Sequence, residues 1–148
     1  LRPLVAEILA DFEAVADRDK IDLRMEVADE LSCVCDRRGL YRVVSNLVDN
    51  AIKYNRPGGW VEVSGSVSDT GVALVVEDSG VGIPAEELGA VMQRFYRIDQ
   101  ARTPGQGGLG LGLAIVKHMV LQMGGKLVLD SREGVGTVAT LSLPPAKV

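Results

Sequence analysis

The sequence predicts an α+β domain, a two-layer α/β sandwich in which helices cover one face of a mixed, mostly antiparallel sheet. Segments with apolar residues at helical spacing are mixed with segments in which apolar and polar residues alternate, and neighbouring strand segments are joined by short turns. The 148 residues match the length of one domain, and 47% hydrophobic with 24% charged residues is typical of a folded chain. We therefore interpret residues 1–148 as a single domain.

The first part of the chain is expected to contain two helices and two strands. Apolar residues at helical spacing predict a helix from about Pro3 to Ala16, and the alternation in Ile21–Val27 predicts a strand. A short strand is expected around Cys33–Cys35. A second helix carries an apolar stripe between Leu40 and Ile52 and ends before Pro57.

The rest of the chain is expected to continue the sheet around one more long helix. Short turns and glycines separate the elements, which is typical of hairpins and helix ends. In order, the expected elements are strands at Trp60–Val67 and Val72–Glu77, a short helix at about Ala85–Val91, a helix from Gly112 to the glycines at 124–125, and strands at Lys126–Asp130 and Thr137–Leu143.

Charge and hydropathy exclude several classes of protein. Sixteen Lys and Arg against twenty Asp and Glu give a net charge of −4, which disfavours general binding to nucleic acids or anionic membranes. No apolar run approaches the roughly 18 residues of a membrane span, and no signal-peptide pattern opens the chain. Because the first residue is Leu1 and not Met, we expect a fragment of a longer protein.

The two cysteines and the single histidine point to packing and not to a metal centre. Cys33 and Cys35 are too few for a zinc site, so we expect small buried side chains in a reducing compartment. His118 lies in an apolar helical pattern, which favours packing over catalysis.

A polar stripe on the second helix could bind phosphate and metal. Asn46, Asn50 and Lys53 are spaced by four and three residues, so they share one helix face. Carboxamide oxygens suit Mg²⁺ and an ammonium group suits phosphate. Taken alone, the stripe is explained better by an ordinary solvated face, which any amphipathic helix has.

Two glycine-rich segments could approach a ligand closely. Asp78 ends an apolar strand just before Gly80 and Gly82, and a carboxylate there can accept a hydrogen bond from an exocyclic amine such as that of adenine. Taken alone, this segment is explained better by a turn capped by an aspartate. The run from Gly107 to Leu113 leads into a helix, where backbone N–H groups can converge on an anion. It lacks the context of a dinucleotide fingerprint and the Lys-Ser/Thr ending of a P-loop.

Together, and in this order, the motifs resemble the catalytic, ATP-binding domain of sensor histidine kinases over essentially all 148 residues. Asn46–Tyr54 resembles the asparagine box, Asp78–Ile83 the first glycine box and Arg94–Arg97 the phenylalanine box. Gly108–Val116 resembles the second glycine box and Gly134–Thr137 the last one. The resemblance implies the Bergerat fold, a mixed sheet backed by three helices, with a nucleotide held between helices and a mobile lid at residues 98–107.

The resemblance also implies roles for individual residues. Asn50 would ligate Mg²⁺, and Asn46, Lys53 and Arg97 would act on the phosphate side in catalysis. Asp78 would receive the adenine amine, supported by Thr137. The full nucleotide-binding set implied in this way is Asn46, Asn50, Lys53, Tyr54, Asp78, Gly80, Gly82, Ile83, Gly108, Gly110, Leu111, Gly112 and Thr137. Two positions depart from the pattern, Asn55 and Leu109, where Thr or Ser is usual.

The implied activity is transfer of the γ-phosphoryl group of Mg-ATP to a histidine on a separate dimerisation domain, in a system that includes a response regulator. His118, between Lys117 and Met119, lacks the acidic neighbour of the acceptor motif, so we expect the acceptor to lie N-terminal to Leu1. We expect the isolated domain to be a monomer without nucleic-acid or direct membrane contacts. The resemblance implies that the parent protein is a homodimer, with or without a membrane anchor. It also implies that this domain lies in the cytoplasm.

Three other functions share such a nucleotide pocket. A clamp or chaperone ATPase of the same superfamily would use a glutamate at the position of Asn46, and a carboxamide cannot act as that base. A serine kinase that binds a sigma factor is disfavoured by the asparagine and phenylalanine boxes. A degenerate ATP-binding regulatory module without phosphotransfer stays open, because Leu109 removes one hydroxyl.

Overall fold

The computed structural model describes the chain except for residues 34, 69–70, 83–110 and 145–148, and it leaves out the side chains of residues 111–114. The described residues form three helices and five strands. The elements are α1 (Arg2–Arg18), β1 (Asp22–Glu26), α2 (Arg37–Lys53), β2 (Trp60–Ser68), β3 (Gly71–Asp78), α3 (Leu111–Gln122), β4 (Lys126–Arg132) and β5 (Gly136–Leu143).

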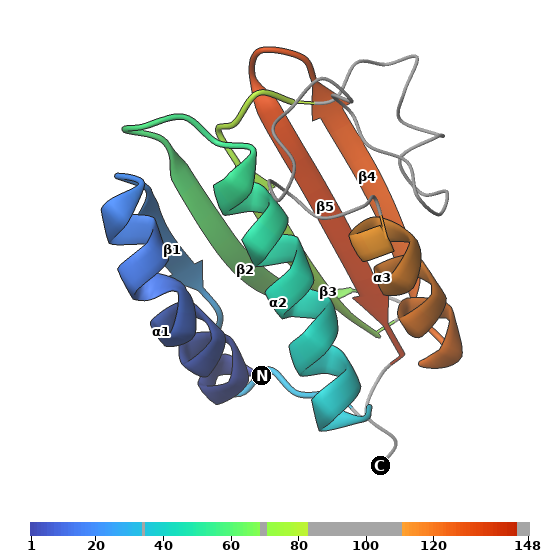
Figure 1. Cartoon of the computed structure of the whole chain (residues 1–148). Helices are drawn as coiled ribbons and strands as arrows, with labels where there is room; N and C mark the ends of the chain where they lie inside the picture. The colour runs from blue at the N-terminus through green and yellow to red at the C-terminus, as the bar shows by residue number, and fades with distance from the viewer. Residues whose placement is uncertain (34, 69–70, 83–110, 145–148) are drawn as a thin grey trace.

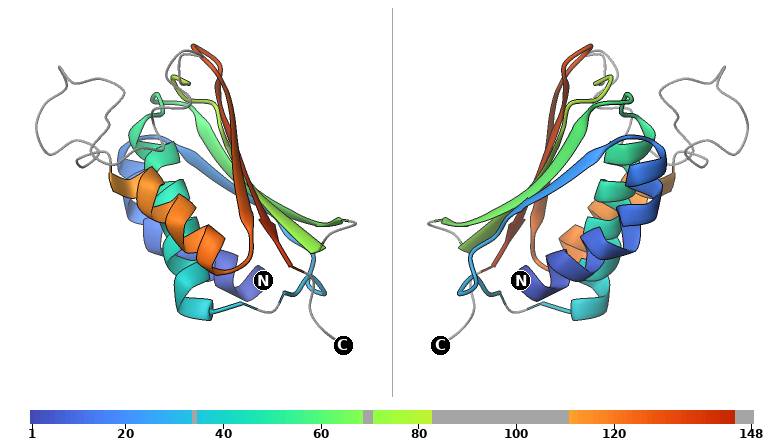
Figure 2. Two further views of the ribbon diagram at one scale, coloured as in Figure 1. Left: turned by 90° about the vertical axis from the view of Figure 1, so that its right-hand side faces the viewer. Right: turned by 90° about the vertical axis from the view of Figure 1, so that its left-hand side faces the viewer.

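The described strands form one sheet with the order β1-β2-β3-β5-β4. β1 is parallel to β2, and the other pairs are antiparallel. The three described helices lie side by side on one face of this sheet, with α2 between α1 and α3 (Figures 1 and 2). The predicted two-layer sandwich with a mixed, mostly antiparallel sheet is therefore confirmed.

The apolar stripe of α2 forms the centre of the core. The Asp36 carboxylate caps this helix by accepting a hydrogen bond from the Gly39 N–H. Val43, Val44 and Val48 are fully buried against the sheet, where Val61 and Val63 of β2 have no exposed surface. This packing leaves the opposite, polar side of α2 free for a site.

Two sequence-based expectations are wrong. The residues Cys33 and Cys35 lie in no strand. Neither residue has a register partner in the described sheet, and both side chains are half-buried and not fully buried as expected. His118 is exposed and does not pack, because α3 turns Val116 and Val120 toward the core.

The other expected helices and strands can be compared with the structure where it describes them. The predicted helices and strands correspond to the observed ones with shifts of a few residues at their ends. The short helix at 85–91 and the lid at 98–107 lie outside the described residues.

We expect Leu74→Ala to lower the free energy of unfolding by about 2–5 kcal/mol, because Leu74 is 1% exposed and its loss leaves a cavity between sheet and helices. Urea unfolding followed by circular dichroism measures the change. Leu121→Ala is the matched control: Leu121 is 60% exposed on α3, and we expect a change below about 0.5 kcal/mol. Equal effects of the two substitutions would contradict the described core.

Candidate functional site

Asp78 ends β3 and lies half-buried at the rim of the sheet, with Thr137 of β5 as its register partner. Its Oδ1 accepts hydrogen bonds from the Gly80 N–H (2.8 Å) and the Thr137 N–H (3.3 Å). Oδ2 has no hydrogen-bond partner among the described residues. The two backbone donors thus orient the carboxylate and leave one oxygen for a ligand.

Burial dominates the protonation of this carboxyl. Desolvation raises the pKa of Asp78 to about 6, and the nearby Glu77 charge adds to the increase, whereas the two backbone hydrogen bonds oppose it. At neutral pH, Asp78 is therefore an ionised, partly desolvated acceptor, which binds a donor more strongly than an exposed carboxylate does.

The loop after Asp78 can be built only with glycine at two positions. A Cβ on Gly80 would lie 2.4 Å from the Tyr54 carbonyl oxygen. Gly82 has φ +72°, and a Cβ there would lie 2.1 Å from the Arg132 carbonyl oxygen. The glycines of this segment therefore permit close packing of the loop between α2 and the end of β4.

Backbone hydrogen bonds connect this loop on both sides. The Val81 N–H donates to the Tyr54 carbonyl (2.9 Å), and the Gly134 N–H donates to the Val81 carbonyl (2.7 Å). The C-terminal end of α2, the loop after β3 and the β4–β5 turn accordingly lie together at the upper end of the molecule in Figure 1.

Arg56 is a residue of this site that sequence reasoning missed. Its guanidinium donates to the carbonyls of Gly80 (3.1 Å) and Gly134 (2.7 Å), and so joins the loop after β3 to the β4–β5 turn. The sequence contains no signal for this role, because the two acceptors are 24 and 78 residues away along the chain.

A second set of contacts supports the same loop from β2. The Trp60 N–H donates to the Ser79 hydroxyl oxygen (2.8 Å), and the Asn55 amide donates to the Trp60 carbonyl (3.0 Å). The departure from the family pattern at Asn55 therefore has a structural use, since its side chain holds the start of β2 beside the end of α2.

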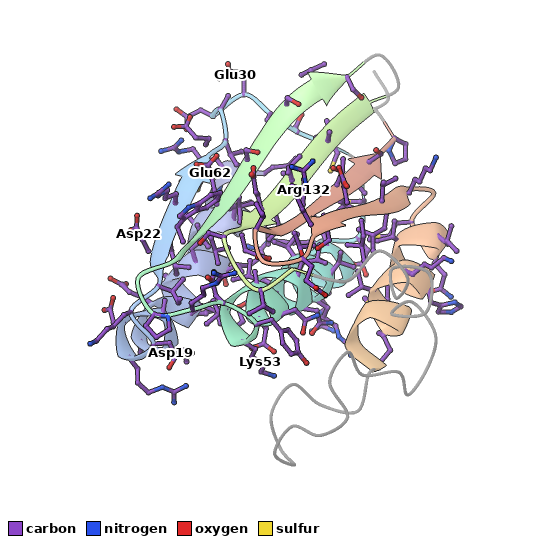
Figure 3. The ribbon with its side chains drawn as sticks, turned by 90° about the horizontal axis from the view of Figure 1, so that it is seen from above. Asp19, Asp22, Glu30, Lys53, Glu62 and Arg132 are labelled. Atoms are coloured by element: carbon purple, nitrogen blue, oxygen red, sulfur yellow. The ribbon has the colours of Figure 1, made fainter. Side chains whose placement is uncertain are left out.

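The polar stripe of α2 leads away from this loop along the helix. Asn46 and Asn50 are half-buried, and Figure 3 shows Lys53 at the C-terminal end of α2. The Lys53 ammonium lies 2.8 Å from an Asp49 carboxylate oxygen, with both side chains more than a third exposed. Such an exposed pair is weak, so the ammonium can turn to another anion at little cost.

The structure brings together five of the expected site residues through printed contacts around the loop after β3, namely Tyr54, Asp78, Gly80, Gly82 and Thr137. Asn46, Asn50 and Lys53 lie on α2, the helix that ends at this loop. Thr137 contacts Asp78 through its backbone, and its hydroxyl is hydrogen-bonded to the Ser131 hydroxyl (2.8 Å). Leu111 and Gly112 lie in the first turn of α3. Ile83, Arg97, Gly108 and Gly110 lie outside the described residues.

The described residues contain no group of three or more His, Cys, Asp or Glu side chains that could hold a metal ion. Among the described residues, the carboxamide oxygens of Asn46 and Asn50 on α2 are of a ligand type that Mg²⁺ accepts. Within the described ranges, no helix is long and apolar enough to cross a membrane.

Comparison with known proteins gives a consistent result. A family described as "Histidine kinase-, DNA gyrase B-, and HSP90-like ATPase" matches residues 35–147. The sensor-like histidine kinase SenX3 of Mycobacterium tuberculosis is 36% identical over 95% of this chain, and the sensor histidine kinase WalK of Bacillus subtilis is 40% identical over 93%. The chain spans only 34% and 23% of these two relatives.

Solved structures agree over nearly the whole chain. Full-length ShkA in complex with AMPPNP matches with a TM-score of 0.86 and 25% identity over 99% of this chain and 30% of that one. The histidine kinase ThkA in complex with the response regulator protein TrrA matches with a TM-score of 0.81 and 27% identity over 99% and 40%.

We expect Asp78→Asn to change the pH dependence of stability. Because the folded-state pKa is raised, from an ordinary 3.8 to about 6, Asp78 contributes stability that is complete below pH 3.8 and is lost as the pH rises through 6. Asparagine removes this loss, so the variant should gain about 1–3 kcal/mol relative to wild type between pH 4 and pH 7.

Urea unfolding at pH 4, 5, 6 and 7 measures this difference. Asp130→Asn, on the exposed side of β4, controls for the loss of one carboxylate from the sheet. A stability difference between Asp78→Asn and wild type that stays constant over this pH range would contradict the described environment of Asp78.

We expect Arg56→Ala to loosen the loop after β3, because two carbonyls lose a charged donor. Amide exchange at Val81 and Gly134 should accelerate by roughly tenfold, which corresponds to about 1.4 kcal/mol of local stability. Arg18→Ala is the control, since among the described residues Arg18 pairs only with its neighbour Asp19 at the end of α1. Unchanged exchange at both amides would show that Arg56 does not hold the loop.

Proposed function

This chain belongs to the family of histidine kinase-, DNA gyrase B- and HSP90-like ATPases, and we propose that it delivers the γ-phosphoryl group of bound ATP to a histidine on a separate dimerisation domain. The observation that carries this proposal is the half-buried Asp78 carboxylate, oriented by two backbone N–H groups at the end of β3. Similarity to sensor histidine kinases such as SenX3 supports the kinase over other members of the family.

Asp78 would select adenine through the base's exocyclic amine. An amine N–H donates to the carboxylate oxygen that the backbone leaves free, and partial burial strengthens this hydrogen bond. Guanine carries a carbonyl at the corresponding position, which would face the carboxylate as acceptor against acceptor. Gly80 and Gly82 keep the loop backbone close enough to line the base.

The polar stripe of α2 would hold the phosphates and Mg²⁺. The Asn50 carboxamide oxygen fits a Mg²⁺ ligand, and Asn46, one helical turn earlier, fits the same phosphate side. When bound, Mg²⁺ neutralises charge on the phosphates. Lys53 would exchange its exposed pair with Asp49 for phosphate oxygens, and the backbone N–H groups of Leu111 and Gly112 at the start of α3 would complete the anion site.

This arrangement favours transfer to a histidine over hydrolysis. Asn46 is a neutral carboxamide and cannot take a proton from water, so the described helix face offers no general base at that position. The chain would contribute positioning and charge stabilisation, while the attacking imidazole nitrogen comes from the acceptor domain and ADP is the leaving group. Arg97 is proposed as a further γ-phosphate contact on sequence grounds alone.

The acceptor and the further partners are proposed to lie outside this chain. The chain spans about a third of SenX3, which leaves room for an acceptor domain in a longer parent protein. ThkA was solved in complex with a response regulator, and we propose a response regulator as the onward partner here. His118, although exposed, is flanked by Lys117 and Met119, and we propose that it is not phosphorylated.

We expect Asp78→Asn to weaken binding of Mg-ATP by about 100-fold or more, because the amide presents a donor or a neutral acceptor to the adenine amine. Asn50→Ala should weaken binding by about tenfold with Mg²⁺ and much less when EDTA replaces it. Isothermal titration calorimetry measures both, with Asp130→Asn as the charge-matched control. Asp78→Asn is expected to be more stable than wild type at pH 7, so its lost binding cannot be attributed to unfolding.

The same samples decide between a kinase and a regulatory ATP-binding module. Incubation with γ-labelled ATP and the parent protein's dimerisation domain should transfer label to that domain and leave His118 unlabelled. Binding without transfer would reject the kinase in favour of the degenerate module. Wild-type affinity in Asp78→Asn would reject the adenine pocket itself.

A further inference from the structure

The two cysteines of the chain form a close pair in the connection between β1 and α2. The Sγ atoms of Cys33 and Cys35 are 3.3 Å apart, and both side chains are half-buried against the edge of the core. The 17 residues of α2 place this pair about 25 Å from the end of the helix that contacts the loop after Asp78. The cysteine pair is therefore separate from the proposed nucleotide site.

The segment that carries the pair is anchored on both sides. Leu31 is buried and accepts a hydrogen bond from the Leu1 amino group, and Asp36 caps α2. Two thiols that already lie 3.3 Å apart lose little conformational freedom when both bind one centre, which favours chelation. The partial exposure of Cys33 and Cys35 leaves them accessible to a small ligand.

The sulfur–sulfur distance places both thiols within reach of a single centre. In a disulfide, side-chain rotation would shorten this distance to about 2.05 Å. Zinc bound tetrahedrally at about 2.3 Å to each sulfur requires about 3.8 Å between them. Bonds of about 2.3 Å span the observed 3.3 Å at an angle near 90°. That angle is typical of a pyramidal, three-coordinate centre such as trivalent arsenic.

The protonation of the thiols affects the binding of a cation and of a neutral ligand differently. Burial, together with the hydrogen bond and charge of Cys35, raises the pKa of the Cys33 thiol to about 12. A divalent cation has to displace that proton into solvent at neutral pH, at a cost that grows with the pKa. A trivalent arsenic oxide reacts with the protonated thiols and carries both protons away.

We propose that Cys33 and Cys35 form a bidentate dithiol site for a trivalent, thiophilic arsenical. Two S–H bonds and the arsenic–oxygen bonds break, two As–S bonds form, and the oxygen leaves as water with both thiol protons. Arsenic remains trivalent throughout, so the step requires no oxidant or reductant. The soft thiol sulfurs match the soft arsenic centre, whereas the described residues offer no third His, Cys, Asp or Glu ligand for a metal cage.

Phenylarsine oxide tests the site in the reduced chain. We expect uptake of one equivalent per chain by intact mass, loss of both thiols to Ellman's reagent, and reversal by dithiothreitol but not by an equal concentration of a monothiol. Cys33→Ser and Cys35→Ser should each bind roughly 100-fold more weakly, because chelation is lost. Far-UV circular dichroism confirms that the variants are folded, and the stoichiometry and reversal in wild type decide the result if either is not.

Several results would overturn the proposal. Uptake of two equivalents, or equal affinity in the single variants, would show independent thiols. Reaction only after unfolding in urea would show that the pair is inaccessible. Conversion of the pair to a disulfide in preference to arsenical uptake, detected as a mass loss of two hydrogens, would show a redox pair instead.

Discussion

The contact between the end of α2 and the loop after β3 is the constraint on which the site depends. The hydrogen bond from the Val81 N–H to the Tyr54 carbonyl joins the first two motifs of the chain, the segment Asn46–Tyr54 and the segment Asp78–Ile83. Because α2 is fixed on the sheet by a fully buried stripe that includes Val44 and Val48, this bond sets the C-terminal end of α2 beside the loop that follows Asp78. Movement of α2 along the sheet would separate them.

The Asp78 carboxylate is the point at which stability and binding oppose one another. Partial burial makes its ionisation unfavourable in the free protein, and the N–H groups of Gly80 and Thr137 compensate only in part. A ligand donor at the remaining oxygen would supply the missing interaction. Unfavourable local free energy of this kind is common at binding sites, where function and not stability selects the residue.

Particular residues show where sequence reasoning was sufficient and where it was not. The helical stripe from Leu40 to Ile52 and the alternation in Trp60–Val67 were read correctly, because burial on one face imposes a period that local sequence records. The strand expected at Cys33–Cys35 was wrong, since alternation over three residues cannot show whether a pairing partner exists. A packing role was expected for His118, because the sequence of an almost wholly apolar helix does not show which side faces solvent.

The sequence by itself determined the α+β class, the family and the residue types of the proposed nucleotide site, because these depend on local periodicity and on motifs of a few residues. The tertiary structure alone decided which groups meet. Arg56 joins carbonyls 24 and 78 residues away, Thr137 supports Asp78 through its backbone, and the two cysteine sulfurs stop 3.3 Å apart. Such contacts depend on the register of the strands and on the position of a helix on the sheet. Neither of these can be recognised from the hydrophobic periodicity of the sequence.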